Sequence, residues 1–310
     1  MPRQIVRPKD LDLDSPGRRD YHVALEHDSM WGDHLIPLTV IVGPEAKPDR
    51  GLVAFGSNHG NEYEGPVAIK NLLGEIKTAD VRGRIILVPV LNPSAFRTGT
   101  RESVGDDRVN MNRAFVDGAG KQPGIAGITH RIAAFVREFI WPRVHVVLDI
   151  HSGGESIKFA CVASFHPLDD PEQSRLVEET AQWFGVPFVM TYQNNTPGLL
   201  TSEAERLGKI VIGTELGYGR AIDAKGLAYA RQGILAAAIR QGQLKGTIAP
   251  IGHHADGTQL RVAIVDRACY TPAPFAGHYQ PVIDIGGRAR AGEVVAWLHD
   301  FDRVDEEPHA

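Results

Sequence analysis

Two short stretches of the chain place metal-binding residue types directly after apolar runs. Residues 56–66 read GSNHGNEYEGP and carry His59 and Glu62, three positions apart. A second stretch, LDIHSGG, carries His151. Imidazole nitrogen and carboxylate oxygen are both zinc ligands, and a catalytic zinc site uses three protein ligands and keeps one position open. The sequence therefore predicts one zinc ion per chain, bound by His59, Glu62 and His151.

The alternative is that His59 and Glu62 are polar residues exposed to solvent, as is more common for an H-x-x-E pair taken alone. The position of the second histidine favours the metal. Both histidines follow an expected strand and precede a loop of small residues, and ligands of mostly parallel sheets bind at the carboxyl ends of the strands.

A further carboxylate follows a third apolar run. GTELGYG places Glu215 at the end of an expected strand, before a glycine loop. Beside zinc, whose bound water ionises near neutral pH, this acid can take a proton and return it to a leaving amine. The alternative is a strand-end acid that caps a helix. The flanking glycines favour the functional interpretation.

Positive charge gathers in one expected long loop, 96–115, FRTGTRESVGDDRVNMNRAF. Its four arginines are Arg97, Arg101, Arg108 and Arg113. Arginine can donate two parallel hydrogen bonds to a carboxylate, so Asn112 and Arg113 could form an anion clamp. Taken singly, each arginine is more often a surface residue.

Apolar runs alternate with amphipathic stretches through the first 245 residues, which predicts an α/β domain with a mostly parallel sheet flanked by helices on both faces. The expected strands cover 51–57, 84–90, 144–150, 188–192 and 209–215, and the expected helices start at 64 and cover 128–141, 171–185, 198–207 and 223–241.

The pattern changes after residue 246, where short strands with glycine turns replace the alternation. We expect a catalytic domain over 1–246, which includes an N-terminal β segment over 1–45. A small all-β, barrel-like domain is expected over 247–310.

Bulk composition excludes several classes of protein. The 310 residues are 43% hydrophobic and 23% charged, with a net charge of −5, which argues against a nucleic-acid-binding face. No apolar run approaches the roughly 18 residues of a membrane span. Two cysteines without C-x-x-C spacing favour a reducing cytoplasm over a disulfide framework. A homo-oligomer is compatible with the sequence.

The ordered motifs GSNHGNEYEGP, NMNRAF, LDIHSGG and GTELG resemble the succinylglutamate desuccinylase/aspartoacylase family, whose fold is zinc-carboxypeptidase-like. The resemblance covers roughly residues 20–300. It implies zinc on His59, Glu62 and His151, and Glu215 as general acid/base. The segments WGDHLIPLTVIVG, HGNEYEGPVA and FRTGTR look most similar to the N-acetyl-2,4-diaminobutyrate deacetylases of ectoine degradation.

The resemblance also implies substrate contacts. Asn112 and Arg113 would grip a substrate carboxylate, and Arg101 would polarise the scissile carbonyl, with Arg97 as the competing choice. Residues 152–166 and the loop with Tyr218 and Arg220 would shape the pocket.

The sequence thus predicts a zinc-dependent amidohydrolase that acts on a small N-acyl amino acid, most simply N-acetyl-L-2,4-diaminobutyrate. The first alternative is the same chemistry on another acyl amino acid or a peptide C-terminus. The second is an inactive binding module of the same fold. A third is a carrier-type β domain fused to an inactive hydrolase, although the C-terminal segment lacks the lysine that carrier domains modify.

Overall fold

The computed structural model describes residues 4–26, 32–116, 127–193 and 196–310. The chain divides into two compact units, Met1–Ala263 and Ile264–Ala310. The first unit contains the site, and its strands form a ten-stranded sheet in the order β1-β2-β3-β5-β4-β6-β9-β7-β8-β10.

The strands of this sheet are β1 (Gln4–Val6), β2 (Gly17–Glu26), β3 (Asp33–Val42), β4 (Gly51–Gly56), β5 (Arg84–Val88), β6 (Val144–Ile150), β7 (Val162–Phe165), β8 (Phe188–Tyr192), β9 (Ile210–Glu215) and β10 (Leu260–Ile264). The helices are α1 (Glu64–Glu75), α2 (Pro93–Thr98), α3 (Ile128–Phe135), α4 (Pro171–Gln182), α5 (Leu200–Arg206), α6 (Ala224–Arg240) and α7 (Gly252–Asp256). A π-helical segment, Val136–Ile140, continues α3.

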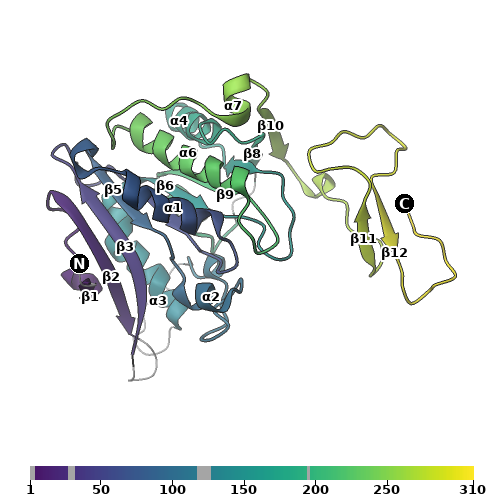
Figure 1. The fold of residues 1–310 in the computed structure, drawn as a ribbon, viewed down its shortest axis with the longest axis horizontal. Helices are drawn as coiled ribbons and strands as arrows, with labels where there is room; N and C mark the ends of the chain where they lie inside the picture. Colours follow the sequence, from purple (N-terminus) through teal and green to yellow (C-terminus); the bar gives the residue numbers. More distant parts are fainter. Residues whose placement is uncertain (1–3, 27–31, 117–126, 194–195) are drawn as a thin grey trace. The chain divides into compact units, whose positions relative to one another are not determined.

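The centre of the sheet is parallel, with β5, β4, β6 and β9 side by side. Alternate residues of a strand point to opposite faces, and both faces are buried. Leu52 and Ala54 of β4 pack in the apolar cluster that includes α1, α4 and α6. Val53 and Phe55 pack in the cluster that includes α3 and α5. Figure 1 shows α1 and α6 along one face of the sheet. The α/β fold with a mostly parallel sheet flanked by helices is confirmed.

The strand pairing brings the predicted site residues to one edge. β4 and β6 are parallel neighbours in which Gly56 pairs with Ile150, so the loops that begin at Ser57 and His151 leave the sheet together. β9 lies beside β6 in the same direction and ends at Glu215.

Several elements differ from expectation. The expected long loop 96–115 contains the end of α2 and a 3-10 turn, Met111–Arg113. β7 was not expected, and it runs antiparallel to β9. α7 lies where a turn-rich segment is expected, and β10 extends the main sheet. Residues 247–263 therefore belong to the first compact unit, while the domain boundary after 246 stays a prediction.

The second unit contains β11 (His278–Pro281) and β12 (Ala296–His299), which pair antiparallel. A small antiparallel sheet at the C-terminal end is thus present. Within the ranges that the structure describes, no helix is both long enough and apolar enough to cross a bilayer.

Candidate active site

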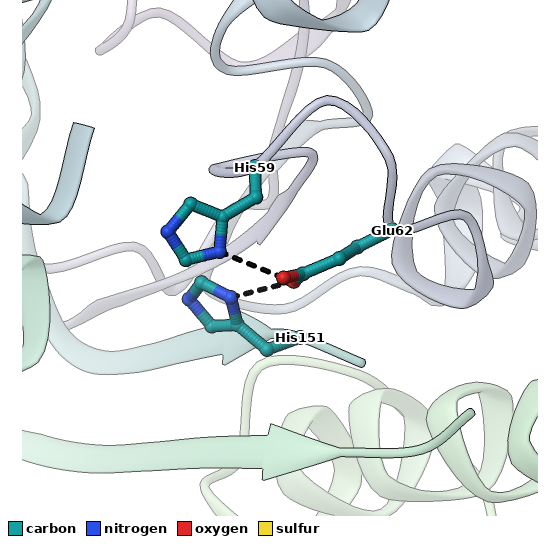
Figure 2. Close-up of side chains that lie close together, drawn as sticks. All are labelled: His59, Glu62 and His151. Carbon is teal, nitrogen blue, oxygen red and sulfur yellow. Dashed lines mark hydrogen bonds and ion pairs between the residues drawn. The ribbon is translucent and has the colours of Figure 1, made fainter. Parts of the chain in front are cut away.

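His59, Glu62 and His151 converge at the carboxyl edge of the sheet, as the sequence predicts. Glu62 lies between the two rings: its Oε1 is 2.8 Å from His59 Nδ1 and its Oε2 is 2.8 Å from His151 Nδ1 (Figure 2). One ligand atom from each of the three residues lies within 4.8 Å of the others, and all three residues are buried. Two imidazoles and one carboxylate form a ligand set typical of catalytic zinc.

The opposite nitrogen of each ring is held by a second polar group. His151 Nε2 lies 2.9 Å from Asp149 Oδ2, and His59 Nε2 lies 3.1 Å from Asn110 Oδ1. Such outer contacts fix the ring orientation and the tautomer of a metal-binding histidine. Both Nδ1 atoms are thereby directed at the position between the rings and Glu62.

The electrostatics of the cluster suit a cation. Burial disfavours the charged imidazole of His151, but the carboxylates of Asp149 and Glu62 outweigh it and raise the pKa of His151 well above its ordinary value. Burial alone would raise the pKa of Glu62, yet the two histidines lower it. The negative charge on Glu62 is therefore favoured in place, and positive charge is favoured beside it. The residues fit a zinc ion.

Glu215 lines the same cavity as the histidines. Burial raises the pKa of Glu215 well above its ordinary value, and the neighbouring charge of Glu62 raises it further. Among the residues that the structure describes, its buried Oε2 has no hydrogen-bond partner. A carboxyl group with a raised pKa in a cleft is suited to move protons near neutral pH.

The cavity has a volume of about 270 Å³. That is below the roughly 300–1,000 Å³ of sites for drug-sized ligands, which favours a small substrate. Its lining residues come from the loop of His59, the segment 101–113, the ends of β6, β7 and β8, the segment 196–205 with α5, and β9. They are His59, Arg101, Asn112, Arg113, Asp149, His151, Ser164, Phe165, His166, Tyr192, Thr196, Leu199, Thr201, Glu205, Gly213, Thr214 and Glu215.

Arg101 and Arg113 both line the cavity. Arg101 Nη1 lies 3.4 Å from Glu62 Oε1, which places a positive charge beside the metal cluster. Arg97, the competing choice, is exposed and is not among the described residues that line the cavity. Arg113 donates from Nη1 to the carbonyl oxygen of Asn112 at 2.6 Å.

Asn112 connects several parts of the site. Its Oδ1 accepts hydrogen bonds from Asn58 Nδ2 at 3.0 Å and from the backbone N–H of Leu200 at 3.1 Å. Its Nδ2 lies 3.4 Å from His151 Nε2. The amide group is thus oriented beside the metal cluster by contacts from β4's loop and from α5.

Comparison with known proteins decides the family. The sequence model of the succinylglutamate desuccinylase/aspartoacylase catalytic domain matches residues 48–239, which include every predicted site residue. The chain belongs to this family. It is accordingly an enzyme of the amidohydrolase class that the family comprises.

Relatives match over nearly the whole chain. N-alpha-acetyl-L-2,4-diaminobutyric acid deacetylase of Halomonas elongata is 32% identical over 99% of this chain and 86% of the relative. The product-bound ectoine utilization protein EutE (DoeB) from Ruegeria pomeroyi superposes with a TM-score of 0.84 at 31% identity, covering 97% of this chain and 88% of that one. A succinylglutamate desuccinylase/aspartoacylase from Rhodobacter sphaeroides superposes with a TM-score of 0.86 at 28% identity, covering 96% and 88%.

Sequence reasoning missed some of the residues that line this cavity. Asp149 stands two residues before His151, and alternation in a strand puts both side chains on one side, so the motif D-I-H could have identified it. His166 and Glu205 carried no such signal. Of the segment 152–166, residues Ser164 to His166 line the cavity, whereas Tyr218 and Arg220 are not among its described lining residues.

Proposed function

We propose that this enzyme is a zinc-dependent deacylase of small N-acyl amino acids, and that its substrate is N-acetyl-L-2,4-diaminobutyrate. The observation that supports this most is the convergence of His59, Glu62 and His151, of which both histidines line one cavity with Glu215. The match to the diaminobutyric acid deacetylase over 99% of the chain supports the choice of substrate.

His59, Glu62 and His151 would hold the zinc, which when bound supplies Lewis acidity that polarises a carbonyl and lowers the pKa of water. Glu215 would remove a proton from the attacking water and deliver it to the nitrogen of the leaving amine. Its raised pKa suits this exchange, because a group that must both take and give a proton works best when its pKa is near the ambient pH.

Two arginines would each interact with a different negatively charged group of the substrate. Arg101, beside Glu62, would stabilise the charge that develops on the carbonyl oxygen. Arg113, with the amide of Asn112, would bind the carboxylate, because its planar guanidinium can donate two parallel hydrogen bonds. Products would be a carboxylic acid and a free amino acid.

A hydrolysis screen tests the proposal. It would compare N-acetyl and N-succinyl derivatives of aspartate, glutamate, ornithine and 2,4-diaminobutyrate by the release of free amine, together with zinc analysis of the purified protein. N-acetyl-2,4-diaminobutyrate should give the highest kcat/KM. A higher kcat/KM for a succinyl derivative would indicate that the enzyme is a desuccinylase. Bound zinc without any hydrolysis would favour the inactive binding module.

The Glu215→Gln variant tests the proton carrier. It should keep zinc and lose about 10²–10⁴-fold in kcat, the usual contribution of general acid–base catalysis. Glu172→Gln is the matched control, because Glu172 is an exposed carboxylate of α4 paired with Arg175. Unchanged turnover in Glu215→Gln would refute the role of Glu215.

A further inference from the structure

One wall of the cavity carries a histidine–carboxylate pair that the proposed reaction leaves without a role. His166 follows β7 and Glu205 belongs to α5, and His166 Nδ1 lies 2.8 Å from Glu205 Oε2. Both side chains are largely buried, with exposed fractions of 14% and 6%. The Tyr192 ring lies beside the His166 ring, with 5.8 Å between their centroids. All three residues line the same cavity as His59 and His151.

The charges that line the cavity can be assigned one by one. Arg101 and Arg113 match the carbonyl oxygen and the carboxylate of the proposed substrate. Two of the acids also have tasks, since Asp149 holds His151 and Glu215 carries the proton. Among the described lining residues, Glu205 is the remaining carboxylate.

The contact with His166 does not use up Glu205 as an acceptor. A carboxylate has two oxygens with about four lone-pair sites, and His166 Nδ1 lies within 2.9 Å of each oxygen. A carboxylate in the wall of a binding cavity favours a ligand that brings a positive group to it, since charged groups across an interface are complementary.

The position of Glu205 fits a role in substrate selection. Thr201 and Glu205 stand one helical turn apart on α5 and both line the cavity. The same helix begins at Leu200, whose backbone N–H donates to Asn112 Oδ1. One short element therefore links the residue proposed to bind the substrate carboxylate with a carboxylate that could bind its side chain.

We propose that Glu205, oriented by His166, is the counter-ion for a positively charged side chain of the N-acyl amino acid. The inference rests on the proposed function and deepens it. It predicts that the enzyme selects amino acids with an ammonium group on a short side chain, as 2,4-diaminobutyrate has. Neutral side chains of the same length would lack the partner for Glu205, and acidic ones would be repelled.

The experiment combines two enzymes with two substrates. Wild type and Glu205→Gln are each assayed with N-acetyl-L-2,4-diaminobutyrate and with N-acetyl-L-2-aminobutyrate, which lacks the amino group. Glu205→Gln keeps the size and one acceptor oxygen, so the fold should persist. The ratio of kcat/KM for the two substrates should fall at least about tenfold in the variant, mostly through KM. Glu205→Asp should recover part of the ratio, and Glu172→Gln should leave it unchanged.

Binding of the reaction product tests the role of Glu205 without the need for turnover. Calorimetry of the product, L-2,4-diaminobutyrate, should give at least about tenfold weaker binding to Glu205→Gln than to wild type. If wild type hydrolyses no N-acyl amino acid but shows this difference, the proposed function fails and the inference stands. An equal loss for both substrates would overturn the inference, as would an unchanged ratio or absence of product binding to wild type.

Discussion

At the scale of single residues, polar and charged groups hold the two histidine rings of the site in fixed orientations. The carboxylate oxygens of Glu62 contact the Nδ1 atoms of both histidines. Asp149 contacts Nε2 of His151, and Asn110 contacts Nε2 of His59. Each ring is thereby fixed by two contacts, one toward the metal position and one away from it. The contacts away from the metal set ring orientation, so they should affect metal affinity although they touch no metal.

Asp149→Asn tests these outer contacts. The variant keeps an acceptor oxygen near His151 Nε2 but removes the negative charge, which should weaken zinc affinity by about 10–100-fold. Competition with a chelator measures the affinity. Asp20→Asn, on β2 outside the site, serves as the control. Wild-type affinity in Asp149→Asn would show that the 2.9 Å contact is dispensable for zinc.

Glu215 should make the metal-free protein sensitive to pH. Its folded pKa is raised, so ionisation costs folding free energy once the pH exceeds the unfolded pKa of about 4.3. Below that pH the carboxyl is protonated in both states and costs nothing. Metal-free Glu215→Gln should therefore match wild type near pH 4 and be more stable at pH 8, by on the order of 1–3 kcal/mol.

Urea unfolding of both metal-free proteins at several pH values measures this difference. A constant difference between variant and wild type across the range would contradict the titration of a buried Glu215.

At the scale of elements, the sequence predicts what depends on single strands and misses what depends on their order. His59, His151 and Glu215 each follow an apolar run, and parallel strands bring such residues to one edge, so the meeting of these three side chains was predictable. His166 was not. It follows β7, a four-residue strand that lies between β9 and β8, antiparallel to β9 and parallel to β8, and only the three-dimensional pairing places Ser164 opposite Gly213.

The different positions of Arg97 and Arg101 also could not be predicted from the sequence. Both stand in the segment expected as a single long loop. Arg97 belongs to α2, whereas Arg101 follows the left-handed Gly99 that ends this helix, and Arg101 alone of the two lines the cavity. The end of a six-residue helix thus decides which guanidinium faces the metal cluster.

Gly60 tests how the loop of His59 is positioned. A Cβ at Gly60 would lie 1.9 Å from the carbonyl carbon and 2.0 Å from the carbonyl oxygen of Ala95, so the loop or α2 must move. Gly60→Ala should lower the free energy of unfolding by about 1–3 kcal/mol and weaken zinc binding through the adjacent His59.

Gly74→Ala is the matched control. Gly74 lies within α1, and a Cβ there meets nothing within 4 Å. This change should raise the free energy of unfolding by up to about 1 kcal/mol, since alanine is the better helix former, and leave zinc affinity unchanged. Denaturant unfolding and chelator competition measure both variants. Gly60→Ala with wild-type stability would contradict the close backbone approach.

At the scale of the whole molecule, the two compact units differ in how much they bury. Both apolar clusters and all three proposed zinc ligands belong to Met1–Ala263. In Ile264–Ala310, every residue of which the structure describes, Leu298 is the one buried apolar side chain. The second unit holds a single pair of strands, and an isolated pair is at best marginally stable in water.

A chain that ends at Val265 tests this division. It retains β10, which is an edge strand of the main sheet, and lacks β11 and β12. Because the folded core and all three ligands remain, it should unfold cooperatively and bind one zinc ion per chain with an affinity within about threefold of wild type. Circular dichroism during heating and chelator competition measure these properties. Loss of cooperative unfolding or of zinc would mean that the first unit depends on the second for its fold, and that the stability carried by the two apolar clusters is insufficient alone.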